Sequence, residues 1–123
     1  MAKSLHDYVQ AALEVVQEVD IDDLPGLTDY WVMDVREPDE FAEGHIPGAR
    51  NYPRGFLEVR ADLEHYKRDP ALADRSQKIV LYCGGGHRSA LAAKVLVEMG
   101  FTDVLSLKGG WTEYTSRGLP VEK

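Results

Sequence analysis

Residues 78–100, KIVLYCGGGHRSALAAKVLVEMG, constrain the fold of this chain more than any other stretch. They predict a buried β-strand (KIVLYC), a turn of three glycines, and a helix (RSALAAKVLVEM) with Gly100 at its C′ position. A strand that passes directly into a helix is half of a β-α-β unit, the arrangement that joins parallel strands. The sequence therefore predicts an α/β domain with a mostly parallel sheet.

The rest of the chain alternates in the same way. Residues 30–35 (YWVMDV) and 103–107 (DVLSL) are compact, β-rich runs that predict two more buried strands. Apolar residues at helical spacing predict a helix near the N-terminus, with Ser4 as its N-cap. Short helices are predicted from Pro38 and after the Gly-Gly-Trp segment at 109–111. A chain of 123 residues fits one such domain.

Composition excludes several classes of protein. Apolar residues make up 44% and charged residues 28%, as in ordinary globular domains, and the net charge of -7 argues against a nucleic-acid partner. No apolar run approaches the roughly 20 residues of a membrane span, and MAKSLHDYVQ has no secretory h-region. The single cysteine predicts a reducing, cytoplasmic setting. Without CxxC or paired histidines, no metal site is predicted.

The single cysteine, Cys83, lies at the carboxyl end of the clearest predicted strand. Ligands of parallel sheets bind at that edge, in the loops that lead from strand to helix. Gly84, Gly85 and Gly86 can adopt positive φ angles and turn successive backbone N–H groups inward, which makes an anion-binding nest. We therefore predict that these glycines cradle either an anionic substrate or negative charge on sulfur.

The residues after the glycines add positive charge to the same place. Arg88 and a protonated His87 lie at the start of the helix, where the helix dipole also favours anions. A thiol in these surroundings is expected to ionise more readily than a free cysteine. The alternative is a buried apolar cysteine with glycines that only make a tight turn. The combination of glycines, basic residues and helix start favours Cys83 as a nucleophile.

Four motifs make the sequence resemble the rhodanese-like family of sulfurtransferases. They follow one another in the family's order: DVREPDEF (34–41), GHIPGARNYP (44–53), VLYCGGGHRSALAA (80–93) and LKGGWTEYTSRGLP (107–120). The resemblance extends from about Val16 onward, so residues 1–15 are predicted to form a helix that packs on a rhodanese-like domain of residues 16–123. It implies a five-stranded, mostly parallel sheet flanked by helices on both faces.

The resemblance also implies a reaction. Cys83 would cycle through a persulfide, taking sulfur from a small anionic donor such as thiosulfate and passing it to cyanide or a thiol, possibly a protein thiol. The substrate-binding loop would be Gly84, Gly85, Gly86, His87 and Arg88, and no cofactor is required. The loop is less cationic than is usual in strong thiosulfate enzymes of the family.

Two other functions remain open. Cell-division-cycle phosphatases related to this family use a loop of five residues between Cys and Arg, whereas four separate Cys83 from Arg88 here. The loop length thus favours sulfur transfer. The domain could instead be a persulfide carrier or a protein-binding module without efficient turnover, and the sequence does not separate a carrier from an enzyme.

Five further residues have less direct roles. Asp34 and Arg36 end a predicted strand on the same side as Cys83, so either could reach and support the active-site loop. The favoured interpretation is that they tie loops together through charge-assisted hydrogen bonds. Arg54 is predicted either to line the pocket mouth and attract an anion or to be an ordinary surface residue. His45 is predicted to organise its loop, and Trp111 to pack the last helix on the sheet.

Overall fold

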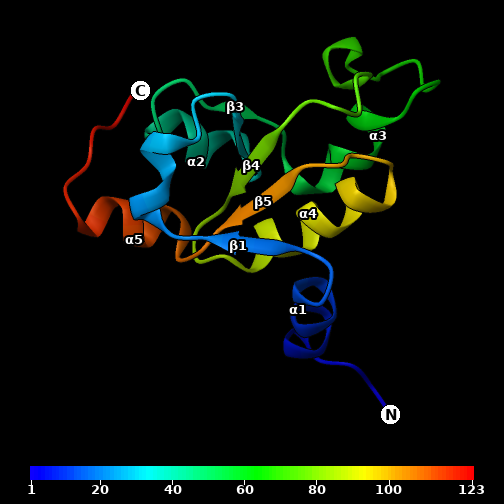
Figure 1. Ribbon diagram of the computed structural model, residues 1–123, viewed down its shortest axis with the longest axis horizontal. Helices are drawn as coiled ribbons and strands as arrows, with labels where there is room; N and C mark the ends of the chain where they lie inside the picture. Colours follow the sequence, from blue (N-terminus) through cyan, green and yellow to red (C-terminus); the bar gives the residue numbers. More distant parts are fainter.

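The computed structural model describes all of residues 1–123 and contains one five-stranded sheet in which every strand pair is parallel (Figure 1). The strand order is β1-β5-β4-β2-β3. The strands are β1 (Gln17–Val19), β2 (Trp31–Asp34), β3 (Arg50–Asn51), β4 (Ile79–Tyr82) and β5 (Val104–Leu107). The predicted α/β class with a five-stranded parallel sheet is confirmed.

Helices cover both faces of the sheet, because the strands are apolar on both sides. In β4, Ile79 and Leu81 point into the larger core, which α3 and α4 cover. Val80 and Tyr82 point into a smaller core on the opposite face, which α5 and a 3-10 helix cover. The helices are α1 (Leu5–Leu13), α2 (Pro38–Glu43), α3 (Leu57–Ala61), α4 (His87–Glu98) and α5 (Gly110–Ser116), with 3-10 helices η1 (Ile21–Gly26), η2 (Arg54–Phe56) and η3 (Pro70–Leu72).

Local signals in the sequence fix several helix ends. Ser4 caps α1 in a capping box with Asp7, and Pro38 is the first residue of α2. Gly100 follows the end of α4 with a φ of +104°, a left-handed conformation that favours glycine. The predicted cap at Ser4, the helix start at Pro38 and the stop at Gly100 are all confirmed.

Helix α1 lies beyond the edge of the sheet, next to β1, with the N-terminus at its outer end (Figure 1). A small apolar cluster of Val9 and Ala12 from α1 with Ala90 from α4 holds it against the domain. This contact is much smaller than the two cores on either side of the sheet. No helix of the chain combines the length and apolar character needed to cross a bilayer.

Candidate active site

The loop after β4 wraps around the sulfur of Cys83. The residue is 1% exposed, and its Sγ accepts hydrogen bonds from the backbone N–H of Gly86 at 3.1 Å and of Ser89 at 3.3 Å. The hydroxyl oxygen of Ser89 lies 3.5 Å from Sγ. Both N–H donors belong to the cap and first turn of α4, where backbone N–H groups have no partner within the helix. The positive end of the helix dipole therefore faces the sulfur.

The glycine turn differs in detail from the prediction. Of the three glycines after Cys83, only Gly86 has a positive φ, at +106°, and it is the N-cap of α4. Neither Gly84 nor Gly85 donates to Sγ. The two donors come from one glycine and one helical residue, three positions apart.

Ser89 is the site residue that our sequence reasoning missed. Besides its N–H contact with Sγ, its hydroxyl contacts the carbonyl of Gly86 at 3.2 Å and the hydroxyl of Ser106 on β5 at 2.9 Å. Ser89 is completely buried. A signal was present in the sequence, because the third residue of a helix has a free N–H that points toward whatever precedes the helix.

Helix α5 turns the carbonyl groups of the loop away from the sulfur. The N–H of Trp111 donates to the carbonyl of Cys83 at 2.7 Å, and the N–H of Thr112 donates to that of Gly84 at 3.0 Å. This approach requires a glycine at 110, since a Cβ there would lie 2.4 Å from the Cys83 carbonyl oxygen and φ is +52°. The loop therefore presents N–H groups to Sγ and carbonyl groups to α5.

Arg88 is held in an ion pair beside the loop. Its Nη1 and Nη2 donate to the two carboxylate oxygens of Glu40 on α2 at 2.9 and 3.3 Å. The hydrogen bonds with Glu40 raise the pKa of Arg88, and those with Arg88 lower the pKa of Glu40. Nη2 also lies 3.2 Å from where a Cβ of Gly84 would be. The predicted cation is thus next to the loop, but a carboxylate neutralises it.

Asp34 and Arg36 form a buried framework under the loops. The Arg36 guanidinium donates to the Asp34 carboxylate, with a shortest distance of 2.8 Å, and to the carbonyl of Gly44 at 2.7 Å. It also lies 4.7 Å from the ring centre of Trp111. Burial alone lowers the pKa of Arg36, but pairing with Asp34 outweighs it and the pKa is raised. These contacts join the end of β2, the segment after α2 and helix α5.

The remaining candidates lie elsewhere. Arg54 pairs with Glu58 at 3.1 Å, one turn along its own segment, and makes no bond to the active-site loop. The two ring nitrogens of His45 face the carbonyl of Phe41 and the carboxylate of Glu122, so His45 joins α2 to the C-terminal segment. His87 is exposed and its side chain makes no hydrogen bond.

Comparison with known proteins identifies the family. The sequence model of the Rhodanese-like domain family matches residues 14–117, so the chain belongs to the rhodanese-like family. It is similar to a sulfurtransferase from Allochromatium vinosum, with 32% identity over 111 residues that cover 87% of this chain and 95% of that protein. The chloroplastic thiosulfate sulfurtransferase 16 of Arabidopsis thaliana is 32% identical over 99 residues, 78% of this chain and 82% of that protein.

The fold agrees with this assignment. A solved structure from Rhodopseudomonas palustris, described as a protein of unknown function and possible tyrosine phosphatase, has a TM-score of 0.91 and 30% identity. The match covers 99% of this chain and 96% of that chain.

Proposed function

We propose that this protein is a sulfurtransferase that moves a sulfane sulfur from a donor such as thiosulfate to a thiophilic acceptor through a persulfide on Cys83. The observation that carries the proposal is the pair of N–H groups, from Gly86 and Ser89, that converge on Sγ at the start of α4. Relatives named sulfurtransferase and thiosulfate sulfurtransferase support the same reaction.

In the first half-reaction, the Cys83 thiolate attacks the outer sulfur of thiosulfate. A new S–S bond forms to Cys83, the S–S bond of thiosulfate breaks, and sulfite leaves with the electron pair. The converging N–H groups and the helix dipole stabilise negative charge on the attacking sulfur and in the transition state. Because the carbonyls of Cys83 and Gly84 are bonded to α5, they do not oppose that charge.

In the second half-reaction, the acceptor attacks the outer sulfur of the persulfide and Cys83 leaves as a thiolate. The same two N–H groups that held the thiolate before the reaction receive it again as the leaving group. This double displacement is covalent catalysis and predicts ping-pong kinetics. Cyanide serves as the assay acceptor, and a thiol is the proposed acceptor in a reducing cytoplasm.

The rival phosphatase function has less support from the geometry. Four residues separate Cys83 from Arg88, one fewer than in the related phosphatase loop. The Arg88 guanidinium, which would have to grip phosphate oxygens, is bonded through both Nη atoms to Glu40. The similar protein from Rhodopseudomonas palustris is described as a possible tyrosine phosphatase, so the test below includes a phosphatase assay.

The test uses one purified preparation and three measurements. Incubation with thiosulfate followed by intact-mass analysis should show one added sulfur atom per chain. Addition of cyanide should then remove that sulfur and release thiocyanate, while an aryl phosphate should remain unhydrolysed. A chain that gains sulfur but turns over slowly with every acceptor would be a persulfide carrier. A chain that hydrolyses the phosphate ester and never gains sulfur would refute the proposal.

A further inference from the structure

A cavity of about 400 Å³ lies beside the active-site loop, between the loop and α1. Leu5 and Val9 of α1 contribute apolar surface, and the loop contributes Gly85, Gly86 and His87. Glu18 of β1 and Lys108, which follows β5, line the remaining side. A cavity of this volume is in the range that holds small molecules. It borders Gly86, whose N–H contacts the sulfur of Cys83.

The wall of this cavity that α1 supplies lies outside the shared family domain. Helix α1 ends at Leu13, and the match to the rhodanese-like family begins at residue 14. The reaction at Cys83 belongs to the family domain, so a wall added from outside it points to a property that differs among members, such as the choice of substrate.

The polar side chains around this cavity are not used by the fold. Lys108 and Glu18 make no side-chain hydrogen bond or ion pair, and the same holds for His6, Gln10 and His87. In two of the other cavities, an arginine of the wall is already bonded. Arg36 binds Asp34, and Arg117 binds both Glu113 and Asp22. The cavity beside α1 thus offers a free ammonium and a free carboxylate together, and Lys108 also lines the neighbouring cavity that contains Asp20 and Arg117.

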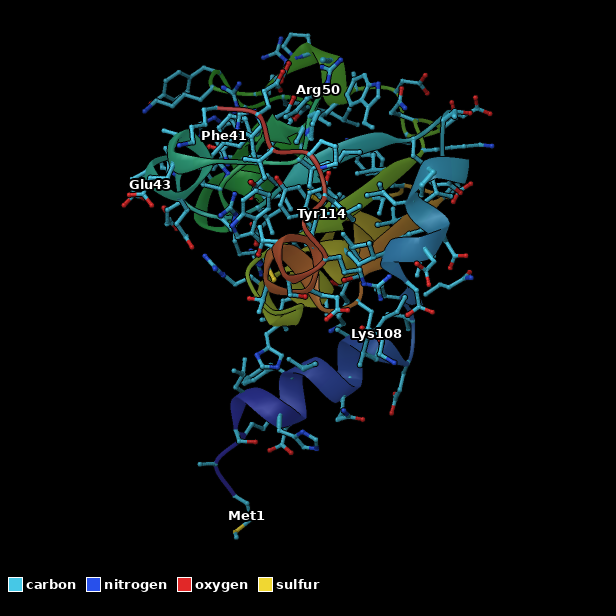
Figure 2. All side chains as sticks on the ribbon, turned by 90° about the vertical axis from the view of Figure 1, so that its left-hand side faces the viewer. Met1, Phe41, Glu43, Arg50, Lys108 and Tyr114 are labelled. Atoms are coloured by element: carbon cyan, nitrogen blue, oxygen red, sulfur yellow. The ribbon has the colours of Figure 1, made fainter.

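The sheet register and the turn after β5 place these two charges at one cavity. Glu18 is paired with Ser106, and Ser106 bonds Ser89 on the α4 side of the sheet. Paired residues of neighbouring strands point to the same face, so Glu18 is on the α4 side of the sheet, and Lys108, in the turn after β5, lines the same cavity. Figure 2 shows Lys108 on the side of the domain that faces α1. A ligand in the cavity therefore meets a positive and a negative group on the same side.

We propose that this cavity binds the sulfur acceptor, and that the acceptor is a small thiol that carries both a carboxylate and an ammonium group, as an amino-acid thiol does. The proposal rests on the sulfurtransferase function proposed above. Lys108 pairs with the carboxylate of the acceptor, Glu18 pairs with its ammonium, and Leu5 and Val9 contact its carbon atoms. Gly85 and Gly86 form the side of the cavity toward Cys83.

The chemical step then balances without any further reagent. The acceptor thiolate attacks the outer sulfur of the Cys83 persulfide and forms a new S–S bond. The bond between the two persulfide sulfurs breaks, its electron pair stays on Cys83, and the acceptor leaves as a persulfide with the proton that the outer sulfur carried.

The first experiment loads the protein with thiosulfate, removes the excess donor and follows sulfur loss by intact mass. Cysteine is compared with 3-mercaptopropionate, cysteamine and 2-mercaptoethanol at equal thiolate concentration, and each rate is divided by the rate of the same thiol with a small-molecule disulfide, which corrects for its intrinsic nucleophilicity. Cysteine should discharge the persulfide at least about fivefold faster than 2-mercaptoethanol, with the singly charged thiols between them. Equal rates for all four thiols would overturn the proposal.

Two variants test which side chain of the cavity binds which charged group of the acceptor. Lys108→Ala should remove the advantage of the carboxylate, and Glu18→Gln that of the ammonium, each raising the cysteine concentration for half-maximal discharge about threefold to tenfold. Lys94→Ala and Glu14→Gln are the matched controls, since neither side chain lines the cavity or makes a side-chain bond. Control variants that raise this concentration as much would overturn the proposal.

A second experiment does not depend on sulfur chemistry. S-methylcysteine carries both charges but has no thiol, so it tests binding to the unloaded protein. It should shift the backbone amide NMR signals of Gly85, Gly86 and Lys108 in the natural protein, but much less in Lys108→Ala. If sulfur never loads but these shifts occur, the sulfurtransferase function fails while the binding site stands. If sulfur loads and no shift occurs, the cavity proposal fails.

Discussion

The active-site loop and the α1 cavity share Gly85 and Gly86, yet they are built from different parts of the chain. The loop binds sulfur with backbone N–H groups, and its own carbonyls are bonded to α5. The cavity presents polar side chains that bond to nothing in the chain, from α1, from β1 and from the segment after β5, and a small apolar cluster packs α1 against α4. The first region is held by backbone hydrogen bonds, and the second is formed where α1 packs on α4.

In our proposals, the loop carries out the sulfur transfer and the cavity beside α1 selects the acceptor. Stabilising a sulfur anion needs donors at fixed positions, and backbone groups held at both ends of the loop satisfy that need. In the proposed acceptor site, the charges come from Glu18 of β1 and Lys108 after β5, and α1 adds apolar side chains, so these residues can be exchanged without disturbing the loop. Substitutions in the loop should therefore affect sulfur loading strongly, and substitutions around α1 should affect it weakly.

The largest effect should come from Cys83→Ser. The hydroxyl fits the same space and can accept the N–H bonds of Gly86 and Ser89, so the free energy of unfolding should change by less than about 1 kcal/mol. Sulfur loading from thiosulfate should fall more than about a thousandfold, because a serine without a base is a poor nucleophile at neutral pH. Intact mass and thermal unfolding measure the two quantities. Appreciable loading of the variant would contradict Cys83 as the sulfur carrier.

The next largest effect should come from Gly110→Ala, which changes the support of the loop and no group that touches sulfur. A Cβ there would lie 2.4 Å from the carbonyl oxygen of Cys83, at a φ of +52°. We expect a loss of about 2–4 kcal/mol in the free energy of unfolding and at least a tenfold drop in the loading rate. Gly55→Ala is the control, because nothing lies within 4 Å of its Cβ position and its φ is not positive. A Gly110→Ala protein that loads sulfur at the normal rate would show that α5 does not shape the loop.

Much of the fold follows from the sequence alone because its signals are local. The run before Cys83 predicts β4 through its apolar, β-rich residues, and Ser4, Pro38 and Gly100 predict helix ends through caps and dihedral preferences. The parallel order follows because each strand leads into a helix. These are properties of neighbours in the chain, so one sequence is enough to see them.

The details of the site are harder to predict from the sequence, because they depend on residues that are far apart in the chain. The sequence places Arg88 beside Cys83, but its ion pair with Glu40 joins residues 48 positions apart. The glycine run allows positive φ at three positions, and the sequence does not indicate that Gly86 alone adopts it. The cavity beside α1 needs α1, β1 and β5 in their final places, which no local pattern specifies.

Glu40→Gln should have a smaller effect, and it should make sulfur loading easier rather than harder. The carboxylate neutralises Arg88 beside the loop and repels an incoming anion, so its removal should lower the thiosulfate concentration for half-maximal loading about threefold to tenfold. Both side chains of the pair are more than a third exposed, so stability should change by less than about 0.5 kcal/mol.

Easier loading in Glu40→Gln could come from the release of the Arg88 guanidinium or from the loss of repulsion by the carboxylate. The double variant Glu40→Gln/Arg88→Ala distinguishes these two causes. If the freed guanidinium attracts thiosulfate, most of the gain should disappear in the double variant. If the gain remains, the loss of the carboxylate alone accounts for it. A Glu40→Gln protein that needs more thiosulfate than the natural protein would mean that the ion pair holds the loop in its working shape.

The smallest effect on loading should come from Ala12→Asp, although it introduces a charge at a fully buried position. Ala12 packs α1 against Ala90 of α4, and an aspartate there favours detachment of α1 over burial of an unpaired carboxylate. No residue of α1 contacts Cys83 or the donors of the loop, so the rate of sulfur loading from thiosulfate should change less than about twofold. Circular dichroism should show the loss of about one short helix, with Glu14→Gln, at the C-cap of α1, as the control. If loading falls as far as in Gly110→Ala, α1 supports the catalytic loop itself, and the division between a rigid reaction centre and a replaceable recognition wall is wrong.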